Sequence, residues 1–226
     1  MPTFYQLNED TPYFPLPPDD EEVEATAVGG DLSPQRLMCA YSTGYFPWYP
    51  YKHCEEILWY CPTKRFVIFP DEIHVSHSMR QLMKKDTYRV TFDSDFDGVI
   101  HHCAEAQGRN TEEEAWLGPD IMRAYRRLHE LKRAASVEVW EDERLVGGLY
   151  GVVGQRAFFG ESMFSLVPSA SKLALIHLAK KAKEMGWKFI DCQLETPHLR
   201  SMGGRTITYD EYMPLLHGDT YTRTRQ

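Results

Sequence analysis

The chain has 226 residues, of which 42% are hydrophobic and 13% aromatic, and it carries a formal net charge of −8 at pH 7. This length predicts one large domain, or one domain with a small appendage, and the apolar residues suffice for a packed core. The acidic balance argues against a protein that coats nucleic acid, although not against a local basic patch. No apolar run approaches the ~20 residues of a membrane span, and the N-terminus lacks a signal-peptide pattern. We therefore expect a soluble, cytoplasmic protein.

The five cysteines are scattered along the chain, and no two of them form a Cys-x-x-Cys pair. A disulfide framework is therefore not expected. His101, His102 and Cys103 stand together, but their apolar surroundings predict a helix, on which adjacent side chains point in different directions. The sequence predicts neither a metal site nor a cofactor.

Prolines at positions 12, 15, 17 and 18 predict an extended N-terminal segment. The first helix is predicted after Ser33, which suits an N-cap, with Pro34 at its first position and Gly44 as its end. The segment that follows, FPWYPY at residues 46–51, cannot be helical because of its prolines. Such an aromatic corner either packs into a core or forms a platform for stacking.

Strands and helices alternate in the rest of the chain. Strands are predicted at 57–60, 66–69 and 88–92, and helices at 76–85, 95–107 and 119–132. A strand at 137–140, a turn at 141–144 and a strand at 145–153 predict a hairpin, to which 156–159 adds a third strand. A long helix at 169–185 ends at Gly186 and leads to a strand at 188–192. This order is typical of an α+β sheet domain.

The end of the last predicted strand carries Asp191, Cys192 and Gln193. Alternate side chains of a strand share a face, so Asp191 and Gln193 are predicted to project together, with Cys192 on the other side. A carboxylate beside a carboxamide can hold an ammonium group and orient a carbonyl, which suits acyl or aminoacyl transfer. The alternative is that both are ordinary polar residues at a strand end.

Seven motifs, in order along the chain, resemble the leucyl/phenylalanyl-tRNA–protein transferase family. They are GGDLSP at 29–34, AY at 40–41, GYFPW at 44–48, LVGGLYGV at 145–152, FGESMFS at 159–165, ASK at 170–172 and DCQ at 191–193. The resemblance implies an enzyme that joins leucine or phenylalanine, and in some cases methionine, from charged tRNA to proteins with N-terminal Arg or Lys, which marks them for degradation. It also implies a GNAT-like mixed-sheet domain at 66–226 after a small α/β domain at 1–65.

The resemblance implies a role for particular residues. Asp191 would hold the incoming amine, Gln193 would orient it or relay its proton, and Glu161 would contact the terminal adenosine or the aminoacyl group. The remaining positions fall into an adenine-binding wall (Trp48, Trp116 and, more weakly, Tyr41 and Tyr125), an apolar pocket for the transferred side chain (Phe158, Met163, Leu175, Ile190) and a tRNA-binding helix (His77, Arg80, Lys84, Lys85). Without the resemblance, core packing would explain the tryptophans, and a solvated helix face would explain the basic residues. Nothing in the sequence demands more than a monomer.

The chain departs from the family pattern at several positions. Ala115 precedes Trp116 where the family has threonine, Tyr60 and Cys61 stand where it has tryptophan and serine, Gln81 replaces a basic residue, and Tyr209 follows the last isoleucine in the region of a family arginine. These differences bear on substrate preference and tRNA affinity rather than on the reaction.

Three alternatives compete with aminoacyl transfer to proteins. A GNAT acetyltransferase needs a glycine-rich turn whose amides hold a pyrophosphate, but the turn at 164–170 has no glycine and contains Pro168. An enzyme that adds amino acids from tRNA to a cell-wall precursor would have a duplicated domain, for which this chain is too short. A non-catalytic protein that recognises N-terminal residues or tRNA ends is the third alternative, and the pair of Asp191 and Gln193 does not favour it.

Overall fold

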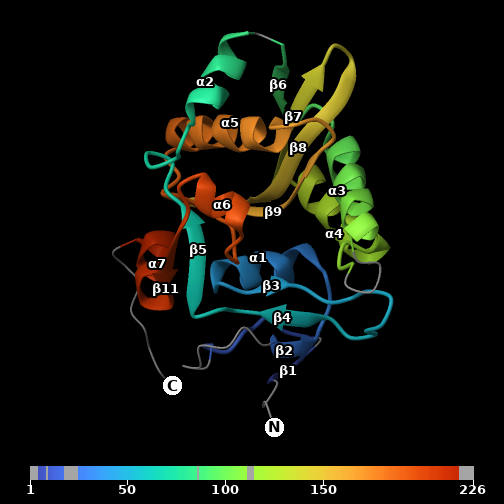
Figure 1. Cartoon of the computed structure of the whole chain (residues 1–226). Coiled ribbons are helices and arrows are strands. Elements are labelled where there is room, and N and C mark those ends of the chain that lie inside the picture. The colour runs from blue at the N-terminus through green and yellow to red at the C-terminus, as the bar shows by residue number, and fades with distance from the viewer. Residues whose placement is uncertain (1–4, 9, 18–24, 86, 111–114, 219–226) are drawn as a thin grey trace.

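The computed structural model describes residues 5–8, 10–17, 25–85, 87–110 and 115–218, and it contains two β-sheets. The larger sheet and its helices form the upper part of the molecule in Figure 1, and the smaller sheet lies at the bottom. The architecture is mixed α+β, as the sequence predicts.

The smaller sheet has four strands in the order β1-β2-β4-β3. These are β1 (Tyr5–Leu7), β2 (Ala25–Gly29), β3 (Phe46–Pro47) and β4 (Leu58–Tyr60). Helix α1 (Pro34–Ser42) connects β2 to β3, and the Ser33 side chain accepts a hydrogen bond from the Arg36 N–H at its start. The aromatic corner at 46–51 therefore begins as a short strand, which positions Trp48 next to the sheet edge.

The larger sheet has seven strands in the order β11-β5-β10-β9-β8-β7-β6. Their bounds are β5 (Lys64–Ile68), β6 (Arg89–Phe92), β7 (Ala134–Glu141), β8 (Arg144–Val153), β9 (Ala157–Ser165), β10 (Phe189–Asp191) and β11 (Arg205–Thr208). Strands β6 to β9 form an antiparallel meander, while β10 is parallel to β9 and antiparallel to β5.

Helices cover both faces of the larger sheet. They are α2 (His77–Lys84), α3 (Phe96–Asn110), α4 (Pro119–Glu130), α5 (Ala170–Met185), α6 (Pro197–Ser201) and α7 (Tyr209–His217). Helix α5 packs on β7 to β9 with one hydrophobic cluster, and α3 packs on the same strands with another. Two successive glycines of β8 permit this: a Cβ at Gly147 would lie 2.4 Å from Ala170 Cβ of α5, and one at Gly148 would lie 3.1 Å from Val99 Cγ2 of α3.

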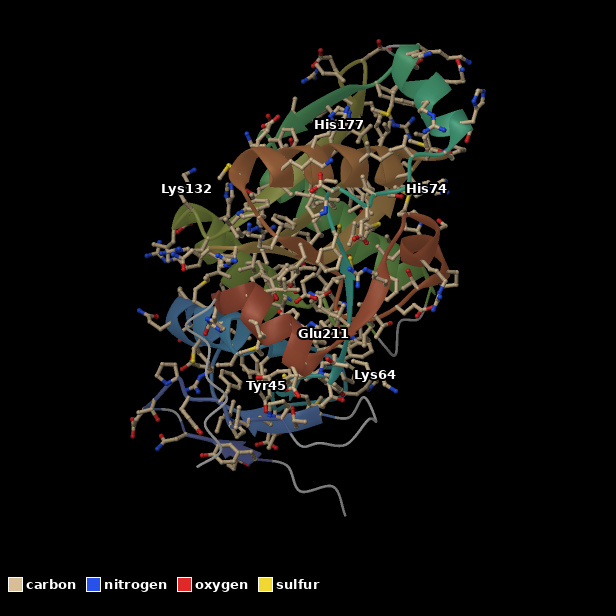
Figure 2. The ribbon with its side chains drawn as sticks, turned by 90° about the vertical axis from the view of Figure 1, so that its left-hand side faces the viewer. Tyr45, Lys64, His74, Lys132, His177 and Glu211 are labelled. Carbon is tan, nitrogen blue, oxygen red and sulfur yellow. The ribbon has the colours of Figure 1, made fainter. Side chains whose placement is uncertain are left out.

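The two sheets share one hydrophobic core. One buried cluster contains Ala27 and Trp59 of the smaller sheet together with Phe159, Phe189 and Tyr212 from the C-terminal part. Figure 2 labels Tyr45, which precedes β3 and belongs to the same cluster. No helix among the described residues is long and apolar enough to cross a membrane.

The predicted elements from the first helix to the last strand are all present, with ends that differ by a few residues. The main error in length concerns β9, which was predicted to end at residue 159 but continues to Ser165, so the motif after Phe159 is part of a strand. The sequence reasoning missed β1, β2, β3, α6, β11 and α7, most of which are short or carry weak periodicity.

Candidate active site

A cavity of about 800 Å³ opens in the larger sheet, between the second half of β9 and the segment that follows β10. Strand β10 pairs with β9 only as far as Asp191, which lies opposite Phe159. After that point the chain stays with β5, since the Cys192 N–H donates to the Phe66 carbonyl and the Phe66 N–H to the Gln193 carbonyl. Residues 160–165 of β9 therefore line the cavity instead of pairing on that side.

Glu161 and Gln193 meet at this opening. Both line the cavity, and the Gln193 Nε2 donates a hydrogen bond of 3.2 Å to Glu161 Oε1. Because a carboxylate only accepts, the amide presents its nitrogen to Glu161, and no partner is recorded among the described residues for its Oε1. The carbonyl of this side chain is therefore available to accept a hydrogen bond from a substrate amine.

Two buried tyrosines hold Glu161 from behind. The Tyr125 hydroxyl of α4 donates to Glu161 Oε2 at 2.8 Å, and it lies 2.5 Å from the Tyr41 hydroxyl of α1. Burial raises the pKa of Glu161 to about 7, although the hydrogen bonds from the tyrosines oppose the shift. A carboxyl group with a pKa near neutrality can accept or donate a proton at physiological pH, which is the property of a general acid or base.

Asp191 does not line the cavity. It is fully buried on the opposite face of the sheet, where Arg65 Nε and Nη2 bind its two oxygens at 2.9 Å and the Tyr212 hydroxyl donates to Oδ2 at 2.7 Å. Arg65 is 1% exposed, and its Nη1 donates to the Gly44 carbonyl. The prediction that Asp191 and Gln193 project into one cavity is wrong, because β10 ends at Asp191 and Gln193 adopts a φ of 56°.

Asp191 still acts on the cavity through the backbone. Its Oδ1 accepts a hydrogen bond of 2.9 Å from the Gln193 N–H. This bond spans two residues and stabilises the left-handed turn that directs Gln193 toward Glu161. A direct contact between Asp191 and an incoming amine is therefore not supported, and the geometry gives Asp191 the place of a positioning residue.

An aromatic wall borders the same cavity. Trp48, which is 36% exposed, and the half-buried Trp116 both line it, together with Phe46. The two tryptophans come from segments far apart in the sequence, and the cavity brings them together. Tyr41 and Tyr125, predicted as weaker parts of this wall, are instead buried behind Glu161 and have no surface in the cavity.

The apolar part of the cavity contains three of the four predicted pocket residues, Met163, Leu175 and Ile190. Phe158 is the exception: it is 1% exposed and packs in the core near Trp187 instead of lining the cavity. Sequence reasoning gave no role to the other side chains at this surface, although several of them stand in the quoted motifs. They include Leu149, Ser165, Ser171, Leu178, Thr196, His198 and Leu199.

The predicted tRNA-binding residues lie outside the cavity. His77, Arg80 and Lys84 are exposed on α2, and Lys85 is exposed at its end. Figure 1 shows α2 beyond α5, at the end of the molecule opposite the smaller sheet. A second hollow, of about 830 Å³, lies between residues 49–57 and the start of α4, and none of the predicted site residues line it.

A cavity that joins an aromatic wall, an apolar pocket and a carboxyl group with a near-neutral pKa is typical of a group-transfer enzyme. The sequence model "Leucyl/phenylalanyl-tRNA protein transferase" matches residues 67–217, and the model of the N-terminal domain of the same family matches residues 30–63. The chain belongs to the leucyl/phenylalanyl-tRNA–protein transferase family and is an aminoacyltransferase.

Curated relatives carry the same family name. The leucyl/phenylalanyl-tRNA–protein transferase of Syntrophus aciditrophicus is 51% identical over 190 residues, which cover 84% of this chain and 78% of the relative. That of Nitrosomonas eutropha is 46% identical over 213 residues, or 93% of this chain and 88% of the relative. The Pseudomonas aeruginosa protein is 44% identical over 207 residues, which cover 90% of each chain.

Two solved structures that align with this chain are much less similar to it. A conserved protein of unknown function from Bacteroides thetaiotaomicron aligns with a TM-score of 0.45 at 10% identity, over 77% of this chain and 62% of that chain. L-PGS from Bacillus licheniformis aligns with a TM-score of 0.44 at 10% identity, over 76% and 56%. Neither similarity is close enough to assign a fold family, so the GNAT-like character of the larger domain stays a prediction.

Proposed function

We propose that this enzyme transfers leucine or phenylalanine from aminoacyl-tRNA to acceptor proteins that begin with Arg or Lys. The observation that carries the proposal is the cavity in which Glu161 and Gln193 are hydrogen-bonded between the tryptophan wall and the apolar pocket. Family membership supports the donor and the reaction type. The nature of the acceptor follows from the resemblance described above.

The reaction needs a neutral α-amine next to an ester carbonyl. The amine nitrogen attacks the carbonyl carbon, a C–N bond forms, the bond to the ribose oxygen breaks, and the ribose hydroxyl leaves with a proton. A free α-amino group titrates near ~8, so only a modest shift is needed to neutralise it. Glu161, with a pKa of about 7, is suited to take the proton of the ammonium group, while the Gln193 Oε1 holds the amine in position.

The aminoacyl side chain would lie among Met163, Leu175 and Ile190. A methionine adapts its shape to either a branched aliphatic chain or a ring, which suits a pocket that accepts both leucine and phenylalanine, and methionine as a third substrate. The terminal adenine would stack on Trp48 and Trp116, because base stacking on aromatic rings needs no duplex.

The body of the tRNA would contact α2. Arg80, Lys84 and Lys85 offer cationic groups for backbone phosphates, with His77 one turn earlier. The chain as a whole is acidic, with a net charge of −8, which favours an acceptor whose first side chain is positively charged.

The larger part of the chain, 66–226, would be a GNAT-like domain preceded by a smaller one at 1–65. The split between the two matched family models, at residues 63 and 67, supports this boundary, and the shared core leads us to expect that both parts unfold together. We expect a monomer in the cytoplasm, where charged tRNA is found.

A transfer assay with purified protein tests the proposal. tRNA charged with labelled leucine, phenylalanine or methionine is mixed with peptides that differ only in a first residue of Arg, Lys or Ala. Label is expected in the Arg and Lys peptides and not in the Ala peptide, and Gln193→Ala should reduce it strongly. Transfer from labelled acetyl-CoA, with none from charged tRNA, would refute the proposal in favour of an acetyltransferase. Tight binding of the Arg peptide without any transfer would refute it in favour of a non-catalytic reader.

A further inference from the structure

One corner of the cavity is polar and has no part in the catalytic arrangement. It is formed by Ser165 at the end of β9, Ser171 in the first turn of α5, and Thr196 and His198 at the start of α6. Strand β9 runs from Glu161 through Met163 to Ser165, so alternate residues lead from the reacting group past the apolar pocket to this corner. At about 3.3 Å per residue, the corner lies roughly 13 Å along the strand from Glu161.

The corner contains hydrogen-bonding groups without protein partners. Ser171 is 9% exposed and lines the cavity, and no partner for its hydroxyl is recorded among the described residues. The His198 Nε2 is buried, and the part of the chain that the structure describes offers it no hydrogen-bond partner. The Ser171 hydroxyl therefore faces the cavity as an unused hydrogen-bonding group, next to one buried imidazole nitrogen that lacks the partner such atoms nearly always have, and together they indicate a ligand with complementary atoms.

The electrostatics of the corner favour an anion. Helix α5 is 16 residues long, its N-terminus lies at this corner, and the side chain of its N-cap Ser169 makes no capping hydrogen bond. Burial lowers the pKa of the His198 imidazole, and the positive charge of Lys172, in the same turn of α5, adds to the shift, so the ammonium group lies near this corner. Among the described residues that line the cavity, Glu161 is the one carboxylate, and it lies at the other end of this stretch of β9. A helix N-terminus with a nearby lysine and no carboxylate attracts negative charge.

We propose that the Ser171–Lys172–His198 corner binds a backbone phosphate in the single-stranded 3′ end of the donor tRNA, within two nucleotides of the aminoacyl ester. The inference rests on the proposed function, because it assumes that the ester lies at Glu161 and the terminal adenine at the tryptophan wall. The turn at 164–170 has no glycine, so it does not enclose a pyrophosphate, but the Ser171 hydroxyl that follows it can donate to one phosphodiester. The contact would fix how far the 3′ end enters, and so hold the ester beside Gln193.

The test uses short donors in which single charges can be removed. The trinucleotide CpCpA carrying leucine at its 3′ end is prepared with natural phosphodiesters, and with an uncharged methylphosphonate at either one of the two linkages. For wild-type protein, neutralising one of the two linkages is expected to lower kcat/KM roughly tenfold, since hydrogen bonds to charged groups contribute strongly to binding. In Ser171→Ala and in Lys172→Met, the same substitution in the donor should cost less than about threefold, because the contact is already lost.

The control is Lys180→Met, which removes the same charge from an exposed position further along α5. It should respond to the methylphosphonate as wild type does. Each ratio is measured on one preparation, so partial unfolding of a variant cancels. A tenfold loss that persists in the Ser171 and Lys172 variants, or no loss in wild type at either linkage, would overturn the phosphate site. Absence of transfer from intact leucyl-tRNA would instead overturn the proposed function, so the two failures are distinguishable.

Discussion

Glu161 and Asp191 lie on either side of Gln193 and are in contact with it, but their surroundings differ. Glu161 borders the cavity, receives hydrogen bonds from neutral groups, and has a pKa of about 7. Asp191 is sealed in the core, and its oxygens are held by Arg65 and Tyr212. Glu161 can therefore change its protonation state near neutral pH, while Asp191 is held in a buried ion pair with Arg65. On this basis we infer that Glu161 transfers the proton and that Asp191 stabilises the turn at Gln193.

The largest expected effect comes from breaking the fixed cluster. Asp191→Ala leaves the Arg65 guanidinium buried without its counter-charge, and such a loss typically costs about 3–5 kcal/mol of unfolding free energy. Urea denaturation followed by tryptophan fluorescence measures it. The double variant Arg65→Met, Asp191→Leu should recover much of the stability, because neither charge remains, but not the activity, because the Gln193 N–H has lost its acceptor. Full activity in the double variant would show that Asp191 has no role in placing Gln193.

Removing the titrating carboxyl should affect the rate rather than the fold. Glu161→Gln is expected to lower kcat/KM on the order of a hundredfold, the lower range for loss of a general base. In wild type the base is active when deprotonated, so kcat/KM should rise as pH increases through about 7, and this inflection should vanish in the variant. An unchanged inflection would assign it to another group, such as the substrate amine.

The same shift has a consequence for stability. The pKa of Glu161 is raised in the folded state, so its stabilising contribution is complete below about 4.5 and is lost as pH rises through about 7. The unfolding free energy of Glu161→Gln, relative to that of wild type, should therefore be higher at pH 8 than at pH 5. Measured unfolding free energies at the two pH values check the sign, which would be opposite for a carboxyl group whose folded pKa was lowered.

A substitution in the aromatic wall tests donor binding separately from the roles of the two carboxyl groups. Trp116→Ala should weaken donor binding by about 1–3 kcal/mol, the range for loss of one base-stacking partner, and so raise KM for charged tRNA by roughly 5- to 150-fold. Phe158→Leu serves as a control, since this side chain packs in the core and does not border the cavity. A larger effect on kcat than on KM would mean that Trp116 orients the ester rather than binding the adenine.

The contrast between the two carboxyl groups also marks what the sequence could predict. Periodicity located the central strands and helices, because each buries one regular apolar face, as β7 and α4 do. Periodicity could not show that the side chains of Asp191 and Gln193 lie in different surroundings. The two-residue period of a strand holds only while the strand continues, and here it ends one residue too early. No local pattern reveals that Arg65, 126 residues away, closes over Asp191.

The cavity itself was only partly predictable. Met163 and Glu161 belong to a motif that the resemblance singled out, but Tyr41 and Tyr125 could not be recognised as supports of Glu161. Their contact joins α1 to α4, which lie 84 residues apart at these tyrosines. Ser171 belongs to another of the quoted motifs, but no role could be given to it, and His198 gave no signal at all, since an unpartnered polar atom is a property of the packed structure.

The smallest expected effect concerns α2, which lies outside the cavity and contacts neither carboxyl group. If α2 contacts tRNA phosphates, Arg80→Gln combined with Lys84→Gln should weaken charged-tRNA binding a few-fold near physiological salt. The plot of log KM against log salt should become shallower by roughly one unit per lost phosphate contact. The leucylated trinucleotide, which lacks the tRNA body, provides the matched control: its kinetics should respond much less to the double substitution. An equal loss with both donors would place the effect in the cavity and remove α2 from the tRNA interface. An unchanged salt dependence would leave these side chains as an ordinary solvated helix face.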